Sequence, residues 1–372
     1  MKRILVFGLS EYYGGVESFF LNYLLFKENK DLQFDFVPEN YDLAKQDQFE
    51  KLGCKVYKLC NWRKNPFKYK KEIETILCSN RYDAVYVNAL SAYNLLPLKI
   101  AKKRGINVRI MHSHNSSAPN NIIKLLIHYY NKKQLNKLTN VKLACSDLAG
   151  KWMFCNDNYV TIPNAVDANK FRFNEEIRKQ KRKELDIKDD TFVVGFVGRL
   201  SYQKNPLFLI DIFKEVVKRN KEAVLLIVGD GELRQSVREK IEELDIIDNV
   251  HLLGNRSDVN KLMQAFDLFL LPSYFEGLAI VLVEAQFSGL KCIVSNTVTT
   301  EANISKSVLY LPLEEGPDIW ANKILEYKSN DISRMNILNA CNGNFDLNCS
   351  SGDFFRLINN IIEKFITVKE TK

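Results

Sequence analysis

The most constraining feature of the chain is a repeated alternation of short apolar segments with segments of helical hydrophobic period. The apolar segments predict strands at 2–8, 32–37, 54–59, 83–87, 107–112, 142–145, 159–162, 192–197, 223–228, 250–253, 267–271 and 291–295. The helix-period segments between them include 15–28, 206–219, 232–244, 258–265 and 278–288. Strands that alternate with helices form parallel sheets with right-handed crossovers, so we expect an α/β fold.

The alternation breaks once, between residues 163 and 190. Residues 163–167 are turn-like, and residues 172–190 are densely charged. We therefore expect two Rossmann-like, doubly wound domains, residues 1–168 and 169–351, that face each other across a cleft. A C-terminal helix at 352–368 is predicted to pack back on the first domain. Ligands of such sheets bind at the carboxyl ends of the strands, so the cleft is the expected site.

Composition narrows the class of protein. Of the 372 residues 46% are hydrophobic, which is too many for a disordered chain, and no apolar run is long enough to span a bilayer. The first eight residues resemble a strand more than a signal peptide. Eight cysteines without a C-x-x-C pair, and only four histidines, favour a reduced compartment and argue against structural zinc. We expect a cytoplasmic enzyme.

Charge is distributed unevenly along the chain. Residues 1–168 carry 25 Lys and Arg against 15 Asp and Glu, whereas residues 169–372 carry 28 against 30. A basic first half suggests an anionic partner, such as a membrane surface, a lipid phosphate or nucleic acid. A lysine-rich surface in contact only with solvent is the alternative.

Two cations lie in the loop that follows the strand at 192–197. Arg199 and Lys204 precede Asn205, a plausible helix N-cap, and Pro206, a plausible first helical residue. Both would project from the carboxyl edge of a sheet, where a guanidinium fork and an ammonium suit a diphosphate. Two loop charges in solvent are the alternative.

A second segment follows the strand at 267–271 and opens a helix. Gly277 permits close approach of a ligand to a helix N-terminus, and Glu276 and Glu284 stand eight residues apart. Along a helix that spacing is about 12 Å, which would suit a sugar at one carboxylate and a ribose at the other. A capping Glu276 and a surface Glu284 are the alternative.

The first half contributes weaker signals at two strand ends. Gly14 and Gly15 precede the helix at 15–28 without forming a G-x-G-x-x-G motif, so a dinucleotide-binding dehydrogenase is disfavoured. His112, His114 and Asn115 follow the strand at 107–111, where an imidazole can stabilise developing charge, although structural histidines are the alternative. No Asp-x-Asp occurs, so we expect no metal at the diphosphate.

Taken in the order in which they occur along the chain, these motifs resemble those of the family-four retaining glycosyltransferases of the two-Rossmann (GT-B) architecture, in particular bacterial capsule and exopolysaccharide members. The motifs are Gly14-Gly15-Val16-Glu17, His112, residues 162–167, residues 198–200, Lys204-Asn205, residues 228–233, residues 276–278 and Glu284-Ala285. Two departures leave the sugar open: Ala165 stands where Gly is commoner, and Ala279-Ile280 lie where residues vary with the donor.

The resemblance also implies roles for single residues. Arg199 and Lys204 would bind the donor diphosphate, with Glu276 on the transferred sugar and Glu284 on the ribose. The backbone of Gly277 and Leu278 would bind phosphate, and Asn255 lies in the loop that lines the base. His112 matches the histidine of the catalytic region. Gly15 would lie on the donor side, and the acceptor-side residues would be Gly14, Glu17, His114 and Asn115.

The resulting expectation is a retaining, metal-independent glycosyltransferase without cofactors. It would move a sugar from a nucleotide-sugar, with UDP favoured, to a lipid-linked or glycan acceptor in bacterial surface polysaccharide synthesis. We expect it at the inner face of the cell membrane, bound peripherally to anionic lipid, and not on nucleic acid. Two alternatives remain: an enzyme similar to UDP-GlcNAc 2-epimerase, and a non-catalytic nucleotide-sugar-binding module of a membrane assembly.

Overall fold

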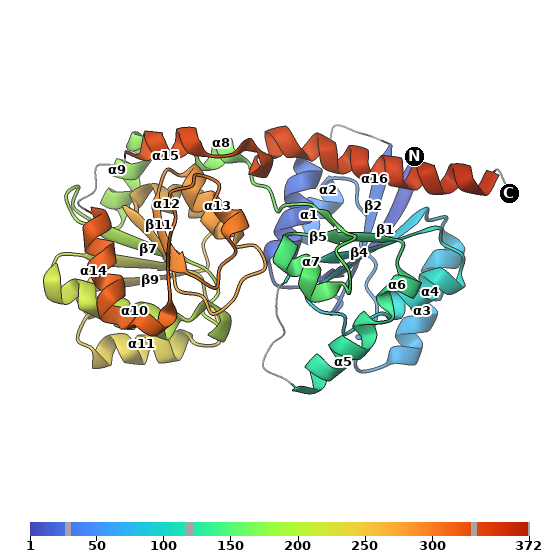
Figure 1. Cartoon of the computed structure of the whole chain (residues 1–372), viewed down its shortest axis with the longest axis horizontal. Coiled ribbons are helices and arrows are strands. Elements are labelled where there is room, and N and C mark those ends of the chain that lie inside the picture. The colour runs from blue at the N-terminus through green and yellow to red at the C-terminus, as the bar shows by residue number, and fades with distance from the viewer. Residues whose placement is uncertain (27–30, 116–121, 329–332, 371–372) are drawn as a thin grey trace. The chain divides into compact units, whose positions relative to one another are not determined.

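The computed structural model describes residues 1–26, 31–115, 122–328 and 333–370. The chain divides into two compact units (Figure 1). The first unit joins Met1–Ala165 with Asn344–Lys372, and the second is Val166–Gly343. The division therefore lies three residues before the predicted boundary at 168, and the C-terminal segment assigned to the first unit begins at Asn344.

The first unit is built on a parallel six-stranded sheet of order β2-β1-β3-β4-β5-β6. Its strands are β1 (Lys2–Leu9), β2 (Leu32–Pro38), β3 (Ala84–Ala89), β4 (Val108–Ser113), β5 (Val141–Ala144) and β6 (Val160–Thr161). Its helices are α1 (Gly15–Leu25), α2 (Gln46–Lys51), α3 (Pro66–Ser79), α4 (Leu96–Lys103), α5 (Ile122–Lys132), α6 (Leu135–Leu138), α7 (Asp147–Met153) and α16 (Leu347–Glu370).

Alternate residues of these strands face opposite sides of the sheet and enter two separate cores. Ile4 and Val6 pack with α1 and α16, whereas Leu5 and Phe7 pack with α3 and α4. The apolar stripe of α16, with Phe355, Ile358 and Ile362 in that core, holds the end of the chain on the first unit.

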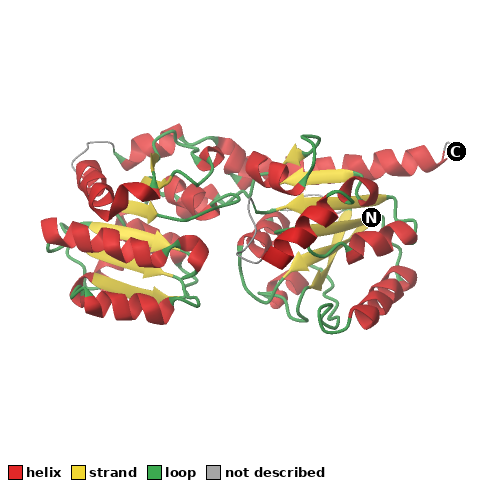
Figure 2. Ribbon diagram, turned by 60° about the horizontal axis from the view of Figure 1, so that its bottom comes forward, coloured by secondary structure: helices red, strands yellow, loops and turns green. Residues whose placement is uncertain are grey.

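The second unit repeats the plan, with helices on both faces of its sheet (Figure 2). The strand order is β12-β11-β10-β7-β8-β9. Its strands are β7 (Val193–Val197), β8 (Val224–Val228), β9 (Val250–Gly254), β10 (Leu268–Leu271), β11 (Lys291–Ser295) and β12 (Leu309–Leu311). Its helices are α8 (Ala168–Phe171), α9 (Glu175–Glu184), α10 (Pro206–Arg219), α11 (Arg234–Glu243), α12 (Val259–Ala265), α13 (Ile280–Phe287), α14 (Gly316–Lys328) and α15 (Arg334–Ala340).

The prediction of two doubly wound sheets is confirmed, with one strand predicted wrongly and one missed. Residues 54–59 form no strand, because only Val56 bridges Phe36 of β2, through two hydrogen bonds around that residue. The three-residue β12 is too short to give a periodic signal. Among the described residues, no helix has the length and apolarity needed to cross a bilayer.

Candidate active site

Two loops of the second unit meet because the strands before them are neighbours. β7 and β10 pair in parallel, so the loops that follow them leave the same edge of the sheet. The loop after β7 runs from Gly198 to Asn205, and α10 begins at Pro206 as predicted. Asn205 occupies the N-cap in the left-handed conformation, with φ of 52°, which Asn adopts more readily than most residues. Its side chain makes no capping hydrogen bond.

Lys204 and Glu276 form an ion pair between these loops. The ammonium lies 2.6 Å from Oε1 of Glu276, and the two side chains are 17% and 6% exposed. Gln203 reinforces the junction, because its amide donates to the carbonyl of Phe275 at 3.0 Å and to Oε2 of Glu276 at 3.3 Å. A buried pair of this kind loses much stability when one partner is removed, so each residue fixes the other.

Arg199 lies on the same loop but contacts a different carboxylate. Its Nε donates to Oε2 of Glu232 at 3.2 Å, and its side chain is 62% exposed. Glu232 follows β8, in a loop whose two glycines allow contact between backbones: a Cβ on Gly231 would lie 2.4 Å from the carbonyl oxygen of Leu200. Arg199 and Lys204 are thus both at the carboxyl edge, each held by its own carboxylate.

The segment after Glu276 reaches its helix later than the sequence suggests. α13 begins at Ile280, so only part of the spacing between Glu276 and Glu284 is helical, and the prediction that one helix spans both residues is wrong. Gly277 and Leu278 are buried in the turn before that helix.

Glu284 differs from Glu276 in lacking a counter-charge. In the part of the chain that the structure describes, its carboxylate has no ion pair and no hydrogen bond, and burial raises its pKa to about 8. A desolvated carboxylate of this kind gains from any ligand that donates hydrogen bonds to it. Asn255, at the end of β9, is exposed and belongs to the same edge of the sheet.

In the first unit, Glu17 secures the loop that joins β1 to α1. Its Oε1 accepts from the backbone N–H of Ser10 at 2.7 Å and its Oε2 from that of Gly14 at 3.0 Å, while the residue is 4% exposed. Burial raises the pKa of this carboxyl group. The contacts assign Glu17 to a capping role, whereas Gly14 and Gly15 are exposed at the start of α1.

His112 lies in β4 and His114 one position beyond it, with imidazole centroids 4.0 Å apart. His112 is fully buried, and its Nδ1 shares a 2.7 Å hydrogen bond with the hydroxyl of Tyr86. His114 is half-buried, and its Nε2 lies 2.9 Å from Oδ1 of Asn88. Burial lowers the pKa of His114 to about 3 and holds the pKa of His112 well below its usual range, so both rings are neutral at physiological pH.

The placement of these rings bears on their roles. His112 is fully buried, so in this conformation it cannot contact a ligand directly and can act on one only through the residues around it. His114 and Asn115 lie one and two positions beyond β4 and are more accessible.

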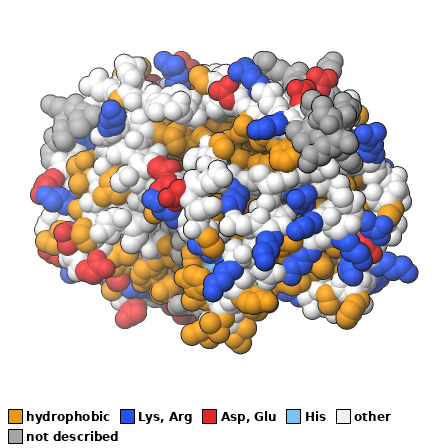
Figure 3. All heavy atoms as spheres, turned by 45° about the vertical axis from the view of Figure 1, so that its right-hand side comes forward, with side chains coloured by type: hydrophobic (Ala, Val, Ile, Leu, Met, Phe, Trp, Pro, Cys, Tyr) orange, Lys and Arg blue, Asp and Glu red, His pale blue; other side chains and the backbone are white. Residues whose placement is uncertain are grey.

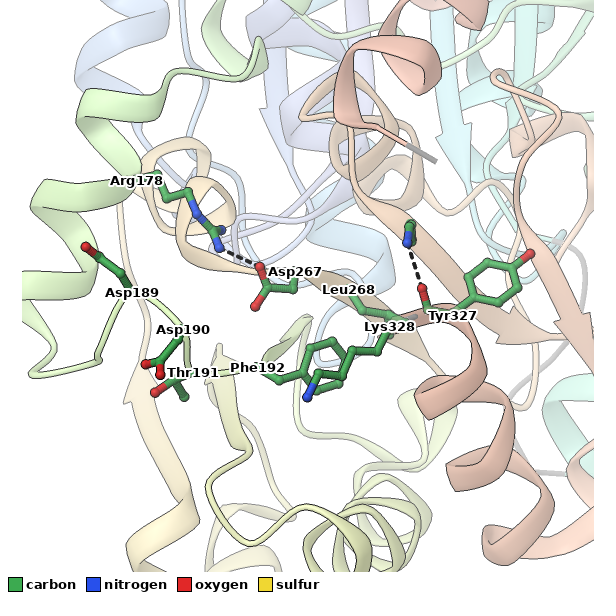
Figure 4. Close-up of a pocket in the computed structure, with 10 residues that line it drawn as sticks. Arg178, Asp189, Asp190, Thr191, Phe192, Asp267, Leu268, Tyr327 and Lys328 are labelled. Carbon is green, nitrogen blue, oxygen red and sulfur yellow. Dashed lines mark hydrogen bonds and ion pairs between the residues drawn. The ribbon is translucent and has the colours of Figure 1, made fainter. Parts of the chain in front are cut away.

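A cavity of about 280 Å³ opens at the opposite edge of the second sheet. Its lining includes Asp267 and Leu268 at the start of β10 and Lys291 at the start of β11 (Figure 4). Arg178 pairs with Asp267 at 2.5 Å, and a dashed line marks this pair in Figure 4. Lys291 donates to the carbonyl of Tyr327 at 2.7 Å. Arg178 and Asp267 neutralise each other, and the cavity is separate from the carboxyl-edge residues above.

Residues 177–340 match the family model described as "Glycosyl transferases group 1". The second unit is therefore similar to the group 1 glycosyltransferases over nearly its whole length. The predicted resemblance to GT-B glycosyltransferases is confirmed.

Relatives and solved structures extend the likeness beyond that domain. A protein of Bacillus subtilis (strain 168) named glycosyltransferase EpsF is 28% identical over 325 residues, 84% of each chain. The UDP-Gal:alpha-D-GlcNAc-diphosphoundecaprenol alpha-1,3-galactosyltransferase of Escherichia coli is 40% identical over 138 residues, 36% of each chain. Anabaena HepE in complex with UDP-glucose has the same fold, with a TM-score of 0.82 at 19% identity, covering 97% of this chain and all of that one.

Three residues near the carboxyl edges of the two sheets were not assigned a role from the sequence. Gln203 and Glu232 hold the second-unit loops, and Asn88 links His114 to β1 by donating to the carbonyl of Phe7 at 3.0 Å. Glu232 and Asn88 each follow a predicted strand closely, which is the signal that could have identified them. Nothing local distinguishes Gln203.

Proposed function

We propose that this glycosyltransferase moves a sugar from a UDP-sugar to a hydroxyl of a lipid-linked or glycan acceptor during synthesis of a bacterial surface polysaccharide. The preformed Lys204–Glu276 pair at the carboxyl edge of the second sheet is the observation that carries the proposal. The names of relatives support the substrate class, since one transfers galactose from UDP-Gal to a diphosphoundecaprenol-linked acceptor and another is an amylovoran biosynthesis glycosyltransferase. HepE, with the same fold, was solved with UDP and with UDP-glucose.

In the proposed reaction, Lys204 and Arg199 bind the donor diphosphate. An ammonium has three N–H donors, so Lys204 can keep Glu276 and still offer two to phosphate oxygens. The carboxylate of Glu276, which its ion pair with Lys204 holds in place, accepts hydrogen bonds from hydroxyls of the transferred sugar. Glu284 accepts from the ribose hydroxyls, and Asn255 lies beside the base.

We propose transfer with retention by displacement on one face of the sugar. The bond from the anomeric carbon to the diphosphate oxygen breaks as a bond to the acceptor oxygen forms, and the acceptor proton passes to the departing phosphate. The two cations stabilise the charge that develops on this leaving group, an effect worth several kcal/mol when the groups are preorganised. Because Lys204 and Arg199 supply this charge, we propose that no metal ion is needed.

The cellular location follows from the acceptor. A lipid-linked acceptor lies in the membrane, and the basic first half suits attraction to anionic lipid at its inner face. We therefore propose a cytoplasmic enzyme bound peripherally to that surface.

The test is a panel of UDP- and GDP-sugars, assayed for thermal stabilisation and for nucleotide release with and without an undecaprenyl-diphosphate-linked sugar. We expect one UDP-sugar to stabilise the protein and to release UDP faster with acceptor, and NMR of the product to show the donor's anomeric configuration. Conversion of the nucleotide-sugar without acceptor would indicate an epimerase. Stabilisation without turnover on any acceptor would indicate a binding module. Either result would overturn the proposal.

A further inference from the structure

One helix of the first unit exposes its apolar side chains. Five large hydrophobic residues of α5 are between 51% and 74% exposed: Ile122, Ile123, Leu126, Tyr129 and Tyr130. Their spacing of one, four, seven and eight positions places them on one face of the helix. Isolated exposed hydrophobic residues are common on protein surfaces, but a continuous helical face of five marks an interaction surface.

The inner side of α5 is held by polar contacts. His128 is buried, accepts from the backbone N–H of Ala92 at 3.0 Å, and stacks on Trp152 with 4.0 Å between ring centroids. Asn131 donates to the carbonyl of Ala92 at 2.8 Å, and Lys132 donates to the carbonyl of Trp152 at 2.6 Å. The helix therefore turns three polar residues, His128, Asn131 and Lys132, toward the protein, whereas five of its apolar residues face outward.

Charge around the helix indicates which partner this face meets. Residues 84–146 contain ten Lys and Arg and no Asp or Glu, and Lys124 and Lys133 of this stretch are exposed beside the apolar face. Hydrophobic side chains gather at the lower edge of the view in Figure 3, with Lys and Arg side chains beside them. A surface that is apolar at its centre and basic around it fits the headgroup region of an anionic lipid leaflet.

We propose that α5 is a membrane-docking helix, whose apolar face enters the headgroup and upper acyl region of an anionic phospholipid leaflet. The proposal rests on the proposed function for its purpose, which is to bring the enzyme to a lipid-linked acceptor. It goes further than attraction by basic charge, because it requires insertion of named side chains. The fixed contacts of His128 and Asn131 present that face without a folding step.

The test compares a triple variant, Ile123→Gln, Leu126→Gln and Tyr130→Gln, with a control triple variant of exposed second-unit residues, Ile247→Gln, Ile319→Gln and Met335→Gln. Co-sedimentation is measured with phosphatidylglycerol-containing and with pure phosphatidylcholine vesicles, at low and high salt. We expect the α5 variant to lose about tenfold or more in affinity for the anionic vesicles, which corresponds to about 1.4 kcal/mol. The control should bind as the wild type does.

Insertion is measured separately with Leu126→Trp and lipids brominated in the acyl chain. We expect vesicles to quench the added tryptophan, and not one introduced by Ile247→Trp. Unchanged melting temperatures would show that the variants fold, since the replaced side chains are exposed. UDP-induced stabilisation should be equal in all variants, and its absence from the wild type would count against the proposed function without touching this proposal.

Three results would overturn membrane docking by α5. In the first, the α5 variant binds anionic vesicles as tightly as the wild type, so that charge alone suffices. In the second, the tryptophan at position 126 is not quenched. In the third, the wild type ignores vesicles but forms a dimer that the α5 variant cannot form, which would assign this face to a second copy of the chain.

Discussion

Glu284 offers the sharpest test of the candidate site, because replacing it should stabilise the protein. Burial raises the pKa of its carboxyl group from 4.5 to about 8, and in the part of the chain that the structure describes nothing neutralises it. Between these two values the folded protein binds a proton that the unfolded chain releases, so stability falls as pH rises through that window. Glu284→Gln removes the titration while keeping the shape of the side chain.

The size of the effect follows from the shift. At pH 8 the raised pKa corresponds to a penalty of about 4 kcal/mol, against less than about 1 kcal/mol at pH 5. These figures are upper bounds, since the side chain is half-buried and water relaxes around it. Urea unfolding of both proteins at the two pH values isolates the titration, because any change in packing is common to both. We expect the variant to gain about 2–3 kcal/mol more stability relative to wild type at pH 8 than at pH 5.

The affinity for a nucleotide should depend on pH in the opposite direction from the stability of the wild type. If ribose hydroxyls donate to Glu284, binding lowers its pKa, so the affinity for UDP should rise with pH up to about 8 in the wild type. The phosphate itself titrates near pH 6, so the comparison is made above pH 7, where the variant should show a flat profile. A variant equally stable at both pH values relative to wild type, or an equal pH dependence of UDP binding in both proteins, would refute the reasoning.

Three further predictions concern the reaction. Lys204→Ala and Arg199→Ala should each raise the activation barrier by about 2–4 kcal/mol in a UDP-release assay, but Lys204→Ala alone should lower the melting temperature, because it strands buried Glu276. Turnover should survive EDTA and should not depend on added Mg²⁺ or Mn²⁺; full loss in chelator with recovery on metal would contradict the charge assignment. His114→Ala should reduce turnover with little change in melting temperature, whereas His112→Ala should reduce both, since His112 is fully buried and bonded to Tyr86. Equal melting temperatures would rule out a structural role for His112.

The sequence allowed the strands and the edge residues to be predicted because these depend on local pattern. Nearly every predicted strand lies within two residues of an observed one, and Arg199, Lys204 and Glu276 follow strands that end at the same edge. Side-chain pairing is a tertiary property and was not predicted. Lys204 contacts a carboxylate 72 positions away, and Arg199 one 33 positions away, so the apparent pair of neighbouring cations is in fact two separate ion pairs.

The α5 helix shows a second limit of sequence pattern. Its apolar residues have the helical period that normally marks a face against the core. Period identifies a face but not what it contacts, and here the contacts of His128, Asn131 and Lys132 turn the polar side inward. The prediction of a strand at residues 54–59 was wrong for a related reason. An apolar segment becomes a strand only where a neighbouring strand offers a full ladder of hydrogen bonds.

The two carboxylates of the second-unit site require different things from a ligand. Glu276 already has a cation at 2.6 Å, so an anionic group can approach Lys204 and Arg199 without first overcoming an isolated negative charge. Glu284 has no such partner in the described structure, and hydrogen-bond donors, a cation or a proton would each relieve its desolvation. A free sugar provides donors without the anion, and inorganic diphosphate provides the anion without donors. A nucleotide-sugar provides both in one molecule, with a ribose at one end of the diphosphate and a hexose at the other, so the unequal environments of Glu276 and Glu284 favour that class of ligand over its parts.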